Sequence, residues 1–317
     1  MSLRRSLRIP VYLAFVVAIA AVAIDVGTDE CDKTKCRGPL EYYRVLGCEP
    51  VYDIENDCCP IKYNCDRVRA QAKNKCYVNG KEYDVGEKLK PEDSNPCDFD
   101  CACQEYNGIA SFICAGTDCA FAPLEPNCFR RPNPSLCCGG NEKVCLDNLE
   151  KRATCVVDGI TYKDGEYFDV KNETDKTCVC RPGYEGENVE PFCYKHNRPY
   201  CSPGFYYSNV IHENCAPIFY NDQPPQTSCS LITRCQEEND TVIHKHDLKS
   251  GEVLDEENVC LFGNLTMHLG DEISQSLQYF CIKCVCEVPP IPTCQHLPPK
   301  ECNYVDYILS EGISGST

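Results

Sequence analysis

Two stretches of the chain, Cys76-Tyr-Val-Asn-Gly-Lys-Glu-Tyr-Asp-Val-Gly-Glu87 and Cys155-Val-Val-Asp-Gly-Ile-Thr-Tyr-Lys-Asp-Gly-Glu166, align without a gap. A more divergent third copy follows the same pattern, Cys260-Leu-Phe-Gly-Asn-Leu-Thr-Met-His-Leu-Gly-Asp271. Such repetition indicates an array of small structural units. Asn79-Gly80 and Asp158-Gly159 suit the two-residue turn of a β-hairpin, because β-forming residues flank them and both turn residues need a positive φ angle.

A tight cysteine cluster follows each hairpin: Cys97, Cys101 and Cys103 in the first copy, Cys178 and Cys180 in the second, and Cys281, Cys284 and Cys286 in the third. A second half-unit then follows the first copy, and it contains Cys114, Cys119, Cys128, Cys137, Cys138 and Cys145. The same spacing occurs alone near the N-terminus, at Cys31, Cys36, Cys48, Cys58, Cys59 and Cys65. The array is therefore expected to begin in the middle of a module.

The composition points to an extracellular chain. Of 317 residues, 30 are cysteine, whereas 2 are methionine and none is tryptophan. This cysteine density is typical of secreted proteins whose modules are held together by disulfides. The 31 lysines and arginines are outnumbered by 48 acidic residues, which gives a formal net charge of −17. Nucleic acids and anionic membranes are therefore poor partners for the chain, and a basic protein is a better one.

The first 23 residues predict a signal peptide. Arg4, Arg5 and Arg8 precede an apolar run from Val11 to Ala23, which ends in an Ala-x-Ala cleavage pattern. The run is shorter than the roughly 20 apolar residues that a membrane anchor needs. We therefore expect a secreted, extracellular protein that has no membrane attachment after cleavage.

The order of cysteines resembles the von Willebrand factor type C repeat: a first cysteine, a Gly-x-x-Tyr-x-x-Gly hairpin, a Cys-x-x-Cys-x-Cys cluster, and a Cys-Cys-Pro-x-n-Cys ending. The resemblance covers Cys31 to Cys302. It implies a partial module (C-terminal half) over 24–70, a complete module over 71–150, an eight-cysteine module over 151–240, and a partial module (N-terminal half) with a tail over 241–317. The complete copy departs from the pattern in two places, because its cluster is one residue longer than usual and Gly139 follows its adjacent cysteine pair.

The fold class expected from these features is small, disulfide-rich and mainly β, with tandem modules of short hairpins and bridge-tied loops in an elongated array. The eight-cysteine copy lacks one cysteine from each half, so we infer that the two are bonded where both exist, Cys97 with Cys137 or Cys138. We expect all 30 cysteines to be paired. Besides the cysteines of the clusters and half-units above, these are Cys76, Cys155, Cys193, Cys201, Cys215, Cys229, Cys235, Cys260, Cys294 and Cys302.

The resemblance also implies a function. Proteins of the chordin, kielin and crossveinless groups bind growth factors of the transforming growth factor β superfamily, including bone morphogenetic proteins, through hairpin apolar side chains and a neighbouring N-terminal segment. In the complete copy, Tyr77, Val78 and Tyr83 are the corresponding ligand-contact candidates. The alternative role for these side chains is to cover a hairpin that has no larger core.

Other kinds of chemistry have weaker signals. Cys281-x-x-Cys284 is also the spacing of a redox motif or half a zinc site, and His244 and His246 could hold a metal. The segment from Cys178 to Cys193 also resembles the end of an epidermal growth factor or trypsin-inhibitor-like module. No nucleophile with an oriented base, paired catalytic carboxylates, calcium loop or phosphate-binding loop is apparent. We therefore expect a protein that is not an enzyme and has no metal or other cofactor.

Two further functions stay open at this point. A structural matrix or secreted component would self-associate. A protease inhibitor would present a stapled loop such as 130–135 or 181–192, with Arg130, Arg131 or Arg181 exposed. Three sequons, at Asn172, Asn239 and Asn264, fit the secretory route and predict surface glycosylation.

Overall fold

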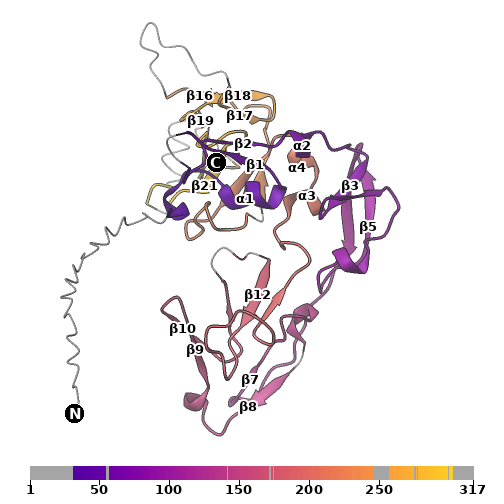
Figure 1. Ribbon diagram of the computed structural model, residues 1–317, viewed down its shortest axis with the longest axis vertical. Coiled ribbons are helices and arrows are strands. Elements are labelled where there is room, and N and C mark those ends of the chain that lie inside the picture. Colours follow the sequence, from indigo (N-terminus) through magenta and orange to yellow (C-terminus); the bar gives the residue numbers. More distant parts are fainter. Residues whose placement is uncertain are drawn as a thin grey trace, which may run out of the picture. The chain divides into compact units, whose positions relative to one another are not determined.

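The computed structural model describes residues 31–54, 57–140, 142–170, 173, 175–230, 232–245, 257–274, 276, 278–298 and 300–302 (Figure 1). The predicted signal peptide and Asn172 lie outside these residues. Four short helices are present in the described chain, at α1 (Leu40–Leu46), α2 (Asp66–Arg69), α3 (Pro203–Tyr206) and α4 (Asn209–His212). Four 3-10 turns accompany them, at η1 (Lys33–Lys35), η2 (Pro91–Asp93), η3 (Cys137–Gly139) and η4 (Leu149–Lys151).

Most of the described secondary structure is short antiparallel ribbons. The two-stranded ribbons are β1 (Glu49–Val51) with β2 (Lys62–Asn64), β3 (Lys75–Val78) with β4 (Lys81–Asp84), β5 (Phe99–Tyr106) with β6 (Ile109–Ala115), β7 (Cys128–Arg130) with β8 (Lys143–Cys145), β9 (Thr154–Val157) with β10 (Ile160–Lys163), and β17 (Val259–Phe262) with β18 (Leu265–His268). The expected disulfide-rich, mainly β fold is confirmed at this level.

Two larger sheets complete the fold. One contains β11 (Tyr167–Phe168), β12 (Lys176–Val179) and β13 (Cys193–Lys195), in that order. The other has six strands in the order β15 (Ile232–Arg234), β14 (Ala216–Phe219), β21 (Thr293–His296), β20 (Ile282–Val285), β19 (Glu272–Ile273) and β16 (Val242–Ile243). Strands β14 and β21 are parallel and bring residues from two predicted modules into one sheet.

The three predicted hairpins form with equivalent registers. The first cysteine of each copy lies opposite the residue at the tyrosine position: Cys76 opposite Tyr83, Cys155 opposite Tyr162, and Cys260 opposite Met267. Asn79, Gly80, Asp158 and Gly159 all have positive φ angles, as the two-residue turn requires. In the third copy, Gly263 has a positive φ but Asn264 does not, so this turn differs from the other two.

The residues after each hairpin make the same second bend. The amide of the glycine donates to the carbonyl of the last cluster cysteine, and that cysteine's amide donates back to the residue after the glycine. In the first copy, the amide of Gly86 donates to the carbonyl oxygen of Cys103, and the amide of Cys103 donates to the carbonyl oxygen of Glu87. The corresponding residues are Gly165, Cys180 and Glu166 in the second copy and Gly270, Cys286 and Asp271 in the third.

The disulfides repeat in the same way. The N-terminal half of each copy contains two equivalent bonds: Cys76–Cys103 and Cys101–Cys114, Cys155–Cys180 and Cys178–Cys193, Cys260–Cys286 and Cys284–Cys294. The C-terminal halves share another two: Cys36–Cys59 and Cys48–Cys65, Cys119–Cys138 and Cys128–Cys145, Cys201–Cys229 and Cys215–Cys235. No cysteine is free.

Cys114, expected in the second half-unit, bonds to Cys101 and so belongs to the first half, and one disulfide then joins the two halves of the complete copy. It is Cys97–Cys137, which confirms the pairing inferred from the eight-cysteine copy. The second copy has no such bond, and its N-terminal half instead contacts the C-terminal half of the first copy. There, Arg131 donates to both carboxylate oxygens of Asp164, and the Arg152 guanidinium lies 3.9 Å from the centre of the Phe129 ring. Contacts therefore cross the predicted boundary near residue 150.

The two terminal half-modules pack against each other. The buried Tyr43 hydroxyl lies 2.8 Å from the carbonyl oxygen of Val288, and the amide of Ile291 donates to it at 3.0 Å. Tyr43 and Val288 belong to a single apolar cluster, and the ring of Tyr63 stacks on that of Tyr43 with centroids 4.4 Å apart. The described residues from 32 onward belong to one compact unit, and this joint ties its two ends together.

Candidate protein-binding site

The structure places the three predicted ligand-contact residues in different environments. Val78 and Tyr83 are only 6% and 2% exposed, in an apolar cluster that also contains Phe112 and Phe205. Tyr77 is partly exposed, and its hydroxyl accepts the amide of Ala72 at 3.0 Å. Val78 and Tyr83 thus contribute to the module core, the alternative role considered for them above. Ligand contact by Tyr77, Val78 and Tyr83 stays a prediction.

The hydroxyl of Tyr83 has a buried partner. It donates to Asp93 at 2.5 Å, and the same carboxylate accepts hydrogen bonds from Asn79 and Lys81, each at 3.0 Å. Burial alone would raise the pKa of Asp93, but the three hydrogen bonds outweigh it and leave the pKa below its ordinary value. Burial, and then the bond to Asp93, raises the pKa of Tyr83 to about 12. This network fixes the hairpin turn to η2.

The neighbouring ribbon of the complete copy displays apolar side chains to solvent. Phe99, Ile113 and Tyr106 are 49%, 48% and 77% exposed. Their strand pairings, Phe99 with Ala115, Ala102 with Ile113 and Tyr106 with Ile109, place all three on one face of β5–β6. We call Phe99, Tyr106 and Ile113 the ribbon patch. Exposed aromatic and aliphatic groups gathered on one face are typical of protein-binding surfaces.

Sequence reasoning missed the ribbon patch, although its signal was present. Asn107 and Gly108 form another two-residue turn with positive φ angles, flanked by alternating apolar residues. That pattern predicts a hairpin by the rule that identified the turn at Asn79.

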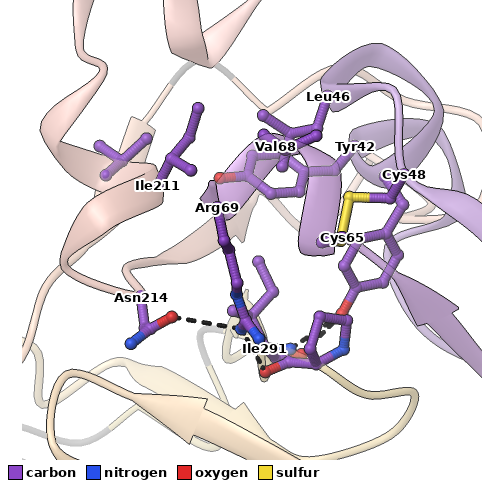
Figure 2. A pocket seen from close by; sticks show the side chains of 12 residues that line it. Tyr42, Leu46, Cys48, Cys65, Val68, Arg69, Ile211, Asn214 and Ile291 are labelled. Carbon is purple, nitrogen blue, oxygen red and sulfur yellow. Dashed lines mark hydrogen bonds between the residues drawn. A yellow bond between two sulfur atoms is a disulfide. The ribbon is translucent and has the colours of Figure 1, made fainter. Parts of the chain in front are cut away.

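The joint between the terminal half-modules encloses only a small cavity. Figure 2 shows Tyr42, Val68, Ile211 and Ile291 around it, with Arg69 donating to Asn214 at 3.2 Å. Its volume is about 20 Å³. A cavity of this size is a packing feature of the joint and cannot accommodate an organic ligand.

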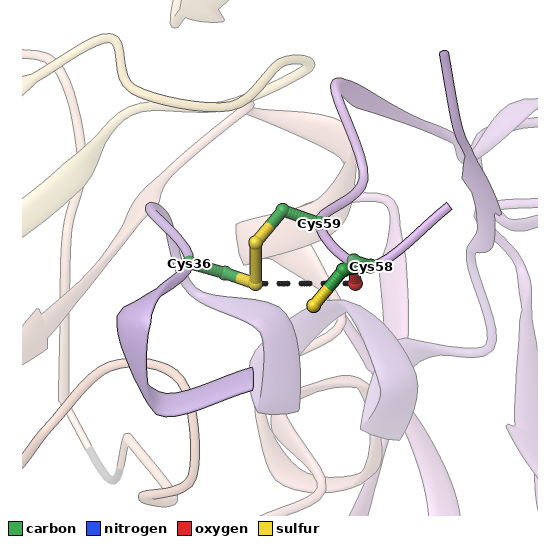
Figure 3. Close-up of side chains that lie close together, drawn as sticks. All are labelled: Cys36, Cys58 and Cys59. Atoms are coloured by element: carbon green, nitrogen blue, oxygen red, sulfur yellow. Dashed lines mark hydrogen bonds between the residues drawn. A yellow bond between two sulfur atoms is a disulfide. The ribbon is translucent and has the colours of Figure 1, made fainter. Parts of the chain in front are cut away.

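Cysteine clusters in the described chain do not offer metal ligands. Figure 3 shows Cys36, Cys58 and Cys59 close together, but Cys36 and Cys59 form one disulfide and Cys58 is also disulfide-bonded. Zinc binds thiolates, which a disulfide lacks. Cys281 and Cys284, the Cys-x-x-Cys pair, are bonded to Cys302 and Cys294, so they do not form a redox pair with each other.

The arginines that an inhibitor loop would present are engaged inside the protein. Arg131 pairs with Asp164 and Glu142, and its side chain is 20% exposed. Arg181 donates to the carbonyl oxygen of Pro132 at 3.1 Å, and Arg130 donates to the carbonyl oxygen of Ala122. These contacts argue against a rigid loop offered to a protease.

The described sequons are at the surface. Asn239 and Asn264 are both exposed, and the amide of Asn264 donates to the side chain of Gln236 at 2.7 Å. Of the histidine pair, His246 lies outside the described residues, and Nδ1 of His244 is 2.9 Å from the carboxylate of Asp271.

No protein-family model matches the chain, and no solved structure matches it. A search of the described residues for a helix long and apolar enough to span a bilayer finds none. The disulfide content is that of an extracellular type of protein, because thirty bonded cysteines require an oxidising compartment.

Proposed function

We propose that the chain is a secreted protein of the von Willebrand factor type C kind that binds growth factors of the transforming growth factor β superfamily, including bone morphogenetic proteins. The order of cysteines supports this family. The repetition of the same disulfides, registers and second bends in three copies supports modules of a single kind.

The ribbon patch carries the proposal. It lies on the one copy that has all ten cysteines, and its three apolar side chains stand on a ribbon held by Cys101–Cys114. A rigid apolar surface loses little conformational entropy on binding, so more of its contact energy becomes affinity. Tyr77 lies nearby in sequence and is the most accessible of the three hairpin candidates. The acidic chain would favour encounter with a basic ligand.

Biosensor binding tests this proposal. The full oxidised protein, secreted from cells, is passed over a panel of bone morphogenetic and related ligands, with a reduced and alkylated sample alongside. Ile113→Asp puts a charge in the ribbon patch and is expected to weaken binding about tenfold or more. Ile160→Asp is the matched control, because Ile160 is 57% exposed on the hairpin of the second copy. Absence of binding at micromolar concentration, or equal losses in both variants, refutes the proposal.

A self-associating matrix component predicts a different result. It would show concentration-dependent assembly in sedimentation and no growth-factor binding. In that case Ile113→Asp would weaken the self-assembly.

A further inference from the structure

A cavity of about 300 Å³ lies beside an edge strand and contains no residue of the ribbon patch in its lining. One wall contains Tyr200, Tyr206 and Tyr207 around α3, and the opposite wall contains Ile232 and Thr233 of β15. Tyr200 and Tyr207 are 51% and 62% exposed. Within the part of the chain that the structure describes, their hydroxyls have no hydrogen-bond partner. The cavity is large enough for one aromatic side chain and presents free polar groups beside apolar rings.

The backbone of β15 is free on the side away from β14. Pro217 of β14 lies opposite Thr233 and has no N–H, so this pair cannot exchange hydrogen bonds. In an antiparallel ladder, the non-bonded pairs direct their N–H and C=O groups outward. Among the described residues nothing pairs with these groups of Thr233, and β15 is the last strand of its sheet. The backbone N–H and C=O of Thr233 are therefore available to a further strand beside the cavity.

The tyrosine wall is held in place. Arg198 and Asp98 form a buried pair at 2.6 and 3.0 Å, and Asp98 also accepts the hydroxyl of Tyr206 at 3.1 Å. The ring of Phe205 stacks on Phe112 with centroids 4.6 Å apart. These contacts anchor α3 to the complete module, so the wall is formed before any ligand arrives.

One carboxylate, that of Asp169, lies near the wall. Burial, and then the charges of Asp169 and Glu41, raises the pKa of Tyr200, but Glu41 is itself paired with Arg44. Asp169 is exposed and pairs with no described residue, and the chain as a whole carries a net charge of −17. A cationic partner is therefore favoured here, both by long-range attraction and by contact of its charges with tyrosine rings.

We propose that β15 and the tyrosine wall together form a docking site for an extended segment of a basic partner protein. The segment adds to β15 as a further strand, exchanges hydrogen bonds with the backbone of Thr233, and inserts one large apolar side chain between Tyr200, Tyr207 and Ile232. Such strand addition draws affinity from the main chain and specificity from the pocket. The inference goes beyond growth-factor binding, because neither the ribbon patch nor a growth factor takes part in it.

The probe is a phage library of random linear peptides of about 12 residues, panned against the full secreted protein, with selected peptides then made synthetically. The expected sequences have one aromatic or large aliphatic residue with flanking lysine or arginine. Thr233→Pro removes only the outward N–H and keeps the extended backbone, so it is expected to weaken binding about three- to tenfold. Thr233→Val retains the N–H and is expected to bind like the wild type.

A second variant, Tyr207→Ala, opens the pocket wall and is expected to weaken binding about tenfold. Thermal unfolding and a free-thiol assay establish that each variant is folded and fully oxidised. The inference is overturned if the selected peptides bind Thr233→Pro and Tyr207→Ala with the same affinity as the wild type. It is also overturned if the library yields no binder. Failure of the growth-factor proposal would leave these peptide results unchanged, since Ile113→Asp does not alter this site.

Discussion

Replacing Tyr43 by phenylalanine tests the joint between the two terminal half-modules. The Tyr43 hydroxyl is completely buried and lies 2.8 Å from the carbonyl oxygen of Val288, and 3.0 Å from both the carbonyl oxygen and the amide nitrogen of Ile291. Phenylalanine keeps the ring that stacks on Tyr63 and removes only this oxygen. The variant therefore isolates the hydrogen bonds from the packing.

The expected loss follows from counting unpaired groups. A hydroxyl donates one hydrogen bond and here accepts another, so its removal leaves the amide of Ile291 and one carbonyl without partners in a buried site. Each unsatisfied buried group costs about 1 to 3 kcal/mol, and local relaxation recovers part of this. We expect the joint to lose about 2 to 4 kcal/mol of stability.

Amide hydrogen exchange at Tyr63 measures this loss, because the Tyr63 amide donates to the carbonyl oxygen of Pro289 across the joint at 2.9 Å, keeps that bond in the variant, and is exposed when the joint opens. A loss of about 2 kcal/mol accelerates exchange roughly 30-fold. Tyr42→Phe is the matched control: Tyr42 is also buried, but its hydroxyl has no hydrogen-bond partner among the described residues. Equal exchange rates in Tyr43→Phe and Tyr42→Phe would refute the assignment of the joint to these hydrogen bonds.

Three other predictions concern the modules. Because the pKa of folded Asp93 is depressed, the carboxylate stabilises the fold above its ordinary pKa of 3.8, and this stability is lost as the pH falls through the folded pKa. In Asp93→Asn, the melting temperature should therefore fall less steeply as the pH is lowered below 3.8. Replacing Cys97 and Cys137 together by serine opens a bond of sequence separation 40 and should cost about 4 kcal/mol by chemical denaturation. Gly165→Ala, whose added Cβ would lie 2.3 Å from the carbonyl oxygen of Arg130, should lower the melting temperature more than Gly86→Ala, where φ is similar and nothing is near. Equal shifts in the two glycine variants would contradict the contact between copies.

The hairpins were predictable because they depend on neighbours in sequence, and one bridge was predictable from the comparison of the repeats. Asn79-Gly80 and Asp158-Gly159 require particular φ angles, and the loss of two cysteines from one copy identified the partner of Cys97. The burial of Val78 and Tyr83 could also have been predicted from the sequence. Val78 shares a strand face with the disulfide-bonded Cys76, and Tyr83 lies directly opposite Cys76. Tyr77 points to the other face.

The joint and the docking site were not predictable. Tyr43 and Ile291 belong to opposite ends of the array, and no periodicity links an isolated tyrosine to a proline-rich segment. The free edge at Thr233 depends on the parallel pairing of β14 with β21, which decides which side of β14 remains for β15. Long-range pairings of this kind leave no local pattern.

The contact of Tyr43 with Val288 and Ile291 also has a mechanical consequence. It closes the chain between these residues into a loop without a covalent bond. Tension applied through the two ends of this loop would load the joint before it reached the disulfide-tied hairpins between them. A protein stretched between two partners would therefore give way first at the hydrogen bonds of the Tyr43 hydroxyl and the apolar contacts around Val288 and Ile291, while each bridged unit kept its shape and the bridges limited the released length.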